Sequence, residues 1–162
     1  AYEIGVRLVG SEMCIRDRSD AMMIAPPIGL VGTGFPVVTA GSEGRVAFGY
    51  VGDIGNQTWH GYMTILTDAF SDNPLFTTVQ VNQPDDPIDS SNAYPEGCGY
   101  ERCGGLGDFL DMAVDQYGRP WFSLANNDQG EIGIFATITE GPSLRGDLTE
   151  LSPMPLGGTL SL

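Results

Sequence analysis

Residues 98–127, CGYERCGGLGDFLDMAVDQYGRPWFSLANN, contain the pattern that decides the fold class. Phe109–Val114 (FLDMAV) and Trp121–Ala125 (WFSLA) are two short apolar runs, and the sequence QYGR at 116–119 lies between them. Two such runs around a glycine-containing turn predict an antiparallel β-hairpin. Gly118 supplies the positive φ that a tight turn requires.

A second version of this hairpin lies earlier in the chain. Residues 35–52 (FPVVTAGSEGRVAFGYVG) align without a gap with residues 109–126, and the aligned turn glycines set the offset at 118 − 44 = 74 residues. Downstream, residues 62–67 (YMTILT) resemble residues 134–139 (IFATIT) at an offset of 134 − 62 = 72 residues. Each unit is therefore predicted to contain a strand, a Gly-Arg turn, a strand, a polar loop and a third strand. The first unit adds a fourth candidate strand at 75–81 (LFTTVQV).

Composition and repetition together predict an all-β protein. The 162 residues include 23 glycines and 11 prolines, which supply many turns, and 41% of the residues are hydrophobic. Repeated units of short antiparallel strands are typical of β-propeller blades, which bury their faces by stacking on neighbouring blades. We therefore expect part of a β-propeller, with about two four-stranded antiparallel blades. The alternative is a β-sandwich whose two hairpins are alike by chance.

The chain divides into five segments on this interpretation. Residues 6–18 (VRLVGSEMCIRDR) closely resemble a peptide that arises when sequencing-adapter DNA is translated at the end of a metagenomic reading frame. We therefore expect residues 1–19 to be non-native, and further blades of the same protein to be missing upstream of them. The remainder is expected to form a leader or partial strand (20–34), two blade-like repeats (35–92 and 93–145, the second with a cysteine loop), and a tail or the start of a next segment (146–162).

The charge and hydropathy of the chain argue against two classes of partner. The formal net charge is −14, from 21 acidic and 7 basic residues, and an acidic field of this size repels a phosphate backbone. We therefore expect no nucleic-acid partner. No run of 18 apolar residues is present, and residues 21–31 (AMMIAPPIGLV) are too short and too rich in proline to span a bilayer. No membrane span is expected.

Three stretches carry a resemblance to a known family: residues 35–50 (FPVVTAGSEGRVAFGY), 58–70 (TWHGYMTILTDAF) and 103–126 (CGGLGDFLDMAVDQYGRPWFSLAN). They resemble secreted sialidase-like β-propellers with BNR-type repeats. The resemblance implies an extracellular or cell-surface protein whose partner is a glycan or a cell-surface protein. If the protein is catalytic, the resemblance implies an exo-glycosidase in which three arginines hold a sialic-acid carboxylate, a Tyr–Glu pair is the nucleophile and an Asp is the acid/base. The alternative is a non-catalytic propeller module that binds a glycan or a protein.

The strand order of a propeller blade predicts where a ligand would bind. The family's Asp-box pattern, S-x-D-x-G-x-x-W, is absent from this sequence, and no motif assigns the family's catalytic roles to particular residues. The loops between second and third strands nevertheless open on one end of a propeller, together with the incoming connections. Carboxylates, amides and an indole, the groups with which proteins bind sugars, are expected at this end. They belong to Asp53, Asn56, Trp59, His60, Asn126, Asn127 and Asp128.

Asp108 is the candidate catalytic acid/base. It follows the flexible Gly107 and precedes a predicted innermost strand, so its carboxyl is expected near the mouth of the central channel. The alternative is that the Asp108 side chain caps the turn at which this strand begins.

A structural role is also expected for two tryptophans, for His60 and for two arginines. Trp59 and Trp121 are expected to act as wedges in the core between blades, and His60 to be a partly buried hydrogen-bonding residue. Arg45 and Arg119 lie in the predicted hairpin turns. They are expected to be structural, and to be either solvated or paired with acidic neighbours.

Cys98 and Cys103 lie in a glycine-rich loop and are expected to form a disulfide, with free thiols as the alternative. A disulfide indicates an oxidising compartment. No Cys or His pair nearby would complete a zinc site, so no metal site is predicted. Asp85, Asp86 and Asp89 offer oxygen ligands for Ca²⁺, but their spacing departs from that of an EF-hand loop. A solvated acidic loop is therefore expected, with Ca²⁺ binding as the alternative, and no cofactor is expected.

Overall fold

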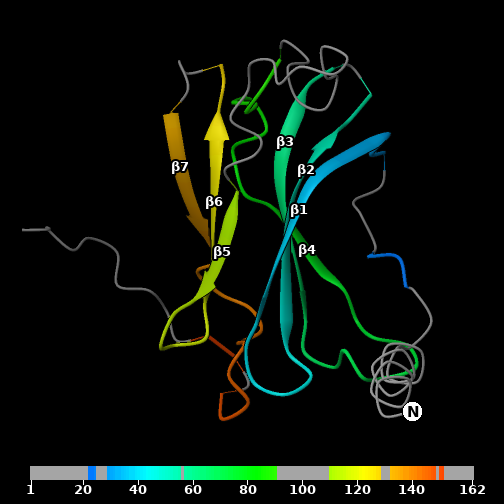
Figure 1. Ribbon diagram of the computed structural model, residues 1–162, viewed down its shortest axis with the longest axis vertical. Coiled ribbons are helices and arrows are strands. Elements are labelled where there is room, and N and C mark those ends of the chain that lie inside the picture. Colours follow the sequence, from blue (N-terminus) through cyan, green and yellow to red (C-terminus); the bar gives the residue numbers. More distant parts are fainter. Residues whose placement is uncertain are drawn as a thin grey trace, which may run out of the picture.

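The computed structural model describes residues 22–24, 29–55, 57–90, 110–128, 132–148 and 150–151. Within these ranges the protein is all-β, as predicted, and contains no helix. Figure 1 shows two antiparallel sheets side by side, with strands β1 and β5 nearest to one another. No part of the described chain forms a helix with the length and hydropathy needed to cross a bilayer.

Both sheets are meanders in which each strand pairs with the next one along the chain. The first sheet consists of β1 (Gly32–Ala40), β2 (Val46–Asp53), β3 (Trp59–Leu66) and β4 (Thr77–Gln80), in this order. The second sheet consists of β5 (Asp111–Val114), β6 (Pro120–Asn126) and β7 (Ile132–Thr137), also in sequence order. All neighbouring strands are antiparallel.

The register of the strands repeats at the offsets seen in the sequence. Val38 of β1 pairs with Phe48 of β2, and 74 residues later Met112 of β5 pairs with Phe122 of β6. Every residue pair of the second sheet has a counterpart in the first, at an offset of 74 residues for its first two strands and 72 for its third. The predicted repeat of three strands is therefore confirmed.

The backbone conformations at the turns also agree with the prediction, whereas β1 departs from it. Gly44 and Gly118 have φ values of 73° and 83°, as tight hairpin turns require. β1 begins within the predicted leader, and a β-bulge between Gly34 and Val37 places one extra residue opposite β2. In this bulge Phe35 has a φ of 50°, which a residue with a side chain rarely adopts, while its side chain packs against the core.

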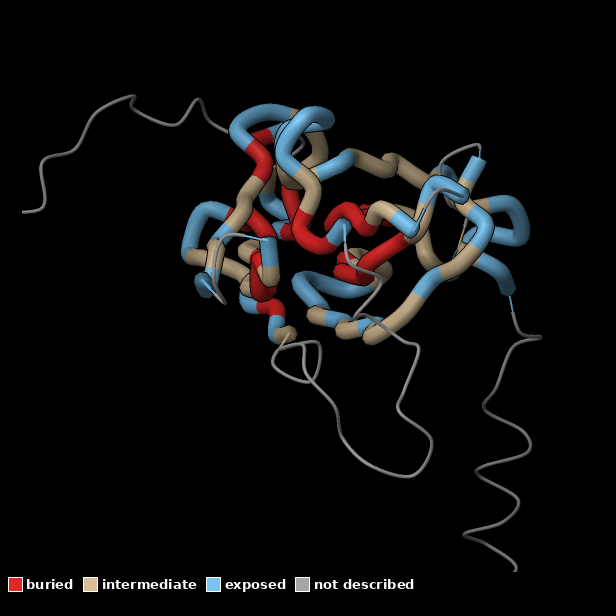
Figure 2. The backbone as a smooth tube through the Cα atoms, turned by 90° about the horizontal axis from the view of Figure 1, so that it is seen from above, coloured by how far each residue is buried: buried red, intermediate tan, exposed pale blue. Residues whose placement is uncertain are grey.

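The core lies between the two sheets and includes Phe122 of β6, which is fully buried. Figure 2 shows the buried segments gathered in the interior of the molecule. Two glycines of the first sheet face this part of the core. A Cβ atom at Gly49 would lie 2.7 Å from the Phe122 ring, and a Cβ atom at Gly61 would lie 2.7 Å from Cδ1 of Leu124. The sheets approach this closely because the two positions carry no side chain.

The two sheets meet through faces that are not equivalent in the repeat. Met63 of β3 is buried in the core between the sheets, but its counterpart Phe135 of β7 is 76% exposed. Phe122 packs toward Gly49 of the first sheet. Its counterpart Phe48 is adjacent to Gly49 on β2, so Phe48 points to the opposite face of that sheet.

Residues 141–148 follow β7 and cross the turns of both hairpins. Leu144 is fully buried; its N–H donates to the Gly118 carbonyl at 2.9 Å, and its carbonyl accepts from the Ser42 N–H at 2.8 Å. The Gly146 N–H donates to the Ser42 hydroxyl at 2.8 Å. We term this part of the molecule (residues 41–45, 115–119 and 141–148) the hairpin end. The part that contains residues 53–55, 57–59, 88–90 and 126–128 is the loop end.

Candidate functional site

The loop end brings together predicted ligand-binding residues from both sheets. The Trp59 N–H donates to the Asp89 carbonyl at 2.7 Å, and the Ile88 N–H donates to the Trp59 carbonyl at 3.0 Å. From the second sheet, the Asn127 N–H donates to the Ile88 carbonyl at 2.7 Å. Residues 88–90 are therefore held by backbone hydrogen bonds to both sheets.

Asp89 is the buried carboxylate of the loop end, and sequence reasoning missed its position. Its side chain is fully buried, and its Oδ2 accepts a hydrogen bond from Asn127 Nδ2 at 3.2 Å. The Ser90 N–H donates to Asp128 Oδ1 at 3.0 Å. The expectation of a solvated acidic loop is therefore wrong for Asp89, whose hydrogen bonding offsets the cost of burying a polar group. The apolar Ile88, amid polar and proline residues, was the available signal that this segment folds inward.

The predicted side chains at the loop end differ in exposure. Trp59 and Asn126 are buried, and for Trp59 this agrees with a place in the core rather than a platform for a sugar ring. Asp53 and Asn127 are half-buried, and Asp128 is exposed. The predicted residues that reach the surface therefore present two carboxylates and an amide.

His60 lies in a separate buried polar cluster on the first sheet. Asn82 Nδ2 and Gln80 Nε2 lie 2.9 Å and 3.1 Å from His60 Nδ1, and the Gly61 N–H donates to Asn82 Oδ1 at 2.9 Å, which orients that amide. Because both neighbours are amide donors, Nδ1 accepts and the ring proton is on Nε2. Burial lowers the pKa of His60. A neutral imidazole whose basic nitrogen already accepts hydrogen bonds is poorly placed to act as a general base.

Four predicted site residues lie outside the described residues: Asp108, Asn56, Cys98 and Cys103. The catalytic candidate and the disulfide therefore stay predictions. Among the residues that the structure describes, no group of three or more His, Cys, Asp or Glu side chains is arranged to hold a metal ion.

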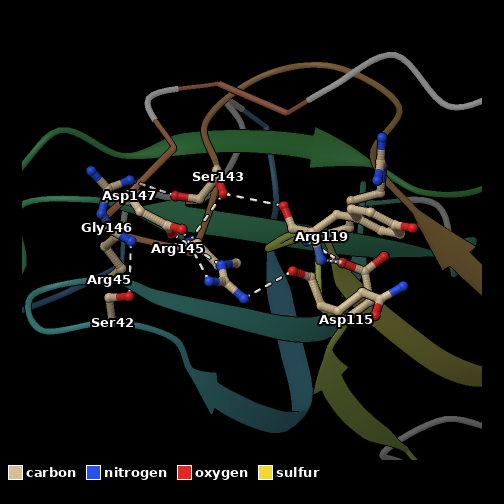
Figure 3. Close-up of polar contacts among 10 residues, drawn as sticks. Ser42, Arg45, Asp115, Arg119, Ser143, Arg145, Gly146 and Asp147 are labelled. Carbon is tan, nitrogen blue, oxygen red and sulfur yellow. Dashed lines mark hydrogen bonds and ion pairs between the residues drawn. The ribbon is translucent and has the colours of Figure 1, made fainter.

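Three arginines gather at the hairpin end, as Figure 3 shows. Arg45 donates from Nη1 to the carbonyl oxygen of Ser143. Arg145 donates from Nη1 to the Gln116 carbonyl at 3.0 Å, and its Nε and Nη2 each donate to one carboxylate oxygen of Asp147 at 3.0 Å. The bonds to the two carbonyls tie residues 141–148 to the hairpin turns.

Arg119, the third arginine, is 4% exposed, and its Cζ lies 5.6 Å from the centre of the Tyr117 ring. Beside it, Asp115 Oδ1 accepts from the N–H groups of Tyr117 and Arg119 at 2.8 Å and 2.9 Å, and Oδ2 accepts from Trp121 Nε1 at 3.2 Å. Burial acts to raise the pKa of Asp115, but these hydrogen bonds and the charge of Arg119 outweigh it and leave the pKa below its ordinary value. Arg119 was expected to be either solvated or next to an acidic residue. The structure agrees with the second expectation, because Arg119 is buried and its charge acts on Asp115.

Two tyrosines of the first sheet are unsuited to nucleophilic attack. The rings of Tyr50 and Tyr62 stack with their centres 5.8 Å apart, and the Tyr50 hydroxyl shares a hydrogen bond of 3.2 Å with Thr64 Oγ1. Burial raises the pKa of both tyrosines, and the proximity of Tyr50 adds to the effect on Tyr62. A phenol that resists ionisation, with threonine rather than a carboxylate as its neighbour, is not activated as a nucleophile.

A cavity of about 500 Å³ opens next to Tyr50. None of the predicted ligand-binding residues lines it. Its walls consist of Met22, Met23, Ile24, Thr33, Gly34, Pro36 and Tyr50. The loop end, rather than this cavity, is therefore the candidate ligand-binding site.

Comparisons of the chain with protein-family models, with curated proteins and with solved structures found no match.

Proposed function

We propose that this chain supplies two adjacent blades of a secreted sialidase-like β-propeller, and that it acts there as a non-catalytic module that binds a glycan at the loop end. The observation that carries the proposal is the contact between non-equivalent faces of the two repeats. Two copies of a sheet related by a two-fold axis would meet through equivalent faces. Here Met63 is buried between the sheets while its counterpart Phe135 is exposed.

A head-to-tail contact of this kind is what a propeller or another stacked repeat requires. In such a series each unit presents one face to the preceding unit and the opposite face to the next. The face of the second sheet that carries Phe135 then corresponds to a surface for a following blade. This contact supports the propeller over a two-fold β-sandwich.

Binding without catalysis is favoured by the state of the reactive side chains among the described residues. The basic nitrogen of His60 accepts hydrogen bonds, and the pKa of Tyr50 is raised by burial. Arg45 and Arg145 bond to backbone carbonyls at the hairpin end, away from the polar residues of the loop end. These arginines are therefore not arranged to hold the carboxylate of a ligand at the loop end.

The loop end offers hydrogen-bonding groups for an uncharged sugar. Asp53, Asn127 and Asp128 reach the surface there, and carboxylates and amides bind sugar hydroxyls. The net charge of −14 disfavours an anionic ligand. A neutral glycan is therefore the proposed ligand class.

The proposal is tested by screening the full chain on an array of neutral and sialylated glycans, together with two variants. Asp128→Asn keeps an oxygen that can accept from the Ser90 N–H but removes the charge, whereas Asp72→Asn removes an exposed carboxylate from a different loop. We expect binding to neutral glycans that Asp128→Asn weakens by about tenfold, as for loss of a charged hydrogen bond, and that Asp72→Asn leaves unchanged.

Two results would overturn the proposal. One is the absence of binding to every neutral glycan, or equal binding by both variants. The other is turnover of a fluorogenic glycoside above the blank by the purified chain, which would show that the module is catalytic.

A further inference from the structure

The outer edge of β7 differs from the equivalent edge in the first sheet. β3 is paired on both sides, by β2 and by β4. Its counterpart β7 pairs with β6, and no strand of the described residues pairs with its other side. Among the described residues, the backbone groups on that side of β7 thus have no strand partner, as at the edge of a sheet.

The chain that follows β7 does not complete the second sheet in the way that β4 completes the first. Residues 141–148 turn toward the hairpin end, where Leu144 is buried. Glu150, near the position where the repeat would place a fourth strand, pairs instead with Pro142, and the Leu151 N–H donates to the Gly141 carbonyl. Within the part of the chain that the structure describes, no strand therefore occupies the fourth position of the second sheet.

β7 also lacks the features that protect edge strands from pairing. Its sequence, Ile132–Thr137 (IGIFAT), contains no charged residue, no proline and no bulge, and it exposes Ile132 by 51% and Phe135 by 76%. Edge strands are commonly shielded by charges, prolines, bulges or short length. β1 carries a bulge with Pro36, and β4 and β5 have only four residues each.

We propose that β7 binds an uncharged extended segment of a partner polypeptide, which adds to the second sheet as an antiparallel fourth strand. The repeat defines the register of this added strand. In the first sheet Val79 of β4 pairs with Met63, whose counterpart is Phe135. The partner strand therefore places an apolar β-branched residue opposite Phe135, with a polar residue on each side of it, as Thr78 and Gln80 flank Val79 in β4.

A second copy of this chain is a poorer occupant than a different polypeptide. Two chains that each carry a net charge of −14 repel one another when their sheets are brought edge to edge. An uncharged segment avoids this repulsion and matches the uncharged sequence of β7. This inference uses the sequence repeat but does not depend on glycan binding.

The test uses the full chain labelled with ¹⁵N and a synthetic peptide, LFTTVQV, which copies the chain's own fourth-strand sequence at 75–81. We expect the peptide to slow amide hydrogen exchange in β7 and to give an intermolecular nuclear Overhauser effect (NOE) between its valine at the position of Val79 and the ring of Phe135. Phe135→Lys should weaken binding by at least about tenfold, because it places a charge at the edge. Phe70→Lys is the matched control, since Phe70 is equally exposed but lies in the loop between β3 and β4.

Ile132→Lys provides a second variant at the same edge if Phe135→Lys changes the fold. The proposal is contradicted if the peptide does not bind at millimolar concentration, if it protects amides outside β7, or if both Phe→Lys variants bind it equally. A concentration-dependent dimer that Phe135→Lys dissociates would also contradict it, by assigning the edge to a second copy.

Discussion

The two sheets share one strand register but occupy different surroundings. In the first sheet, Gly61 and Met63 of β3 face the second sheet and lie in the core. Their counterparts in the second sheet, Gly133 and Phe135, are exposed, and β7 has no fourth strand beside it within the described residues. Register is thus set by the local sequence of each unit, whereas burial is set by what each unit packs against. Equivalent substitutions in the two units should therefore have unequal effects.

The largest difference in the free energy of unfolding is expected between alanine variants of the two equivalent phenylalanines, Phe122 and Phe48. Phe122→Ala removes a fully buried ring and should lower the free energy of unfolding by about 3–5 kcal/mol. Phe48→Ala truncates a half-buried side chain, and we expect a loss of about 1–2 kcal/mol. Urea denaturation of the full chain measures both values. Equal losses, or a larger loss at Phe48, would contradict the assignment of faces.

The next comparison adds one methyl group to equivalent glycines. Gly61→Ala should destabilise the fold by about 1–3 kcal/mol, because its Cβ would lie 2.7 Å from Leu124 and from Val81. At Gly133 a Cβ would have no neighbour within 4 Å, so Gly133→Ala should change stability by less than about 0.5 kcal/mol. The same denaturation assay separates the two variants. A similar cost at both positions would show that the second sheet is covered where we describe it as open.

A smaller effect is expected at the hairpin turns, where Asp115 is the counterpart of Gly41. Asp115→Asn should cost about 1 kcal/mol at neutral pH, because the amide places a donor where a carboxylate oxygen now accepts. The pKa of Asp115 is lowered in the folded protein, so its contribution is fully present above the unfolded pKa of about 3.9 and is lost as the pH falls below it. Unfolding curves from pH 7 to pH 2 should show the variant and the original chain converging in acid. A difference that does not decrease as the pH falls below about 3.9 would assign the effect to something other than ionisation.

The smallest effect concerns His60, whose counterpart in the second sheet is the exposed Ile132. His60 is the single histidine of the chain, so its imidazole resonances can be titrated by NMR without ambiguity. Because burial lowers its pKa, the midpoint should fall below about 6.5. As the pH falls, His60 is therefore protonated in the unfolded chain at a higher pH than in the folded protein. The free energy of unfolding should decrease slightly as the pH falls below about 6.5. A midpoint at or above this value would place His60 in solvent or beside a carboxylate.

Local patterns in the sequence were sufficient to predict the two hairpins and the repeat of three strands. Aligned glycines at 44 and 118 and the apolar runs around them gave both hairpins, because turn geometry and side-chain alternation act over a few residues. The β4 candidate at 75–81 also contains the observed strand.

Features that depend on contacts between distant segments were not predictable in this way. The Arg45 side chain bonds to the carbonyl of Ser143, and Asp89 is buried against the second sheet through Asn127. Neither contact leaves a periodic pattern, because the partners are separated by 98 and 38 residues. Trp59 and His60 were predicted to lie in the loop between the second and third strands, but they are the first two residues of β3. They are buried beside residues 88–89 and Asn82, which are distant in the sequence.

The most direct test of the head-to-tail arrangement is a set of NOE measurements from the ring of Phe122. The packing described here predicts cross-peaks from this ring to the Hα atoms of Gly49 on the first sheet. Cross-peaks from the Phe122 ring to the Phe48 ring, with none to Gly49, would mean that equivalent faces meet, and would contradict the account.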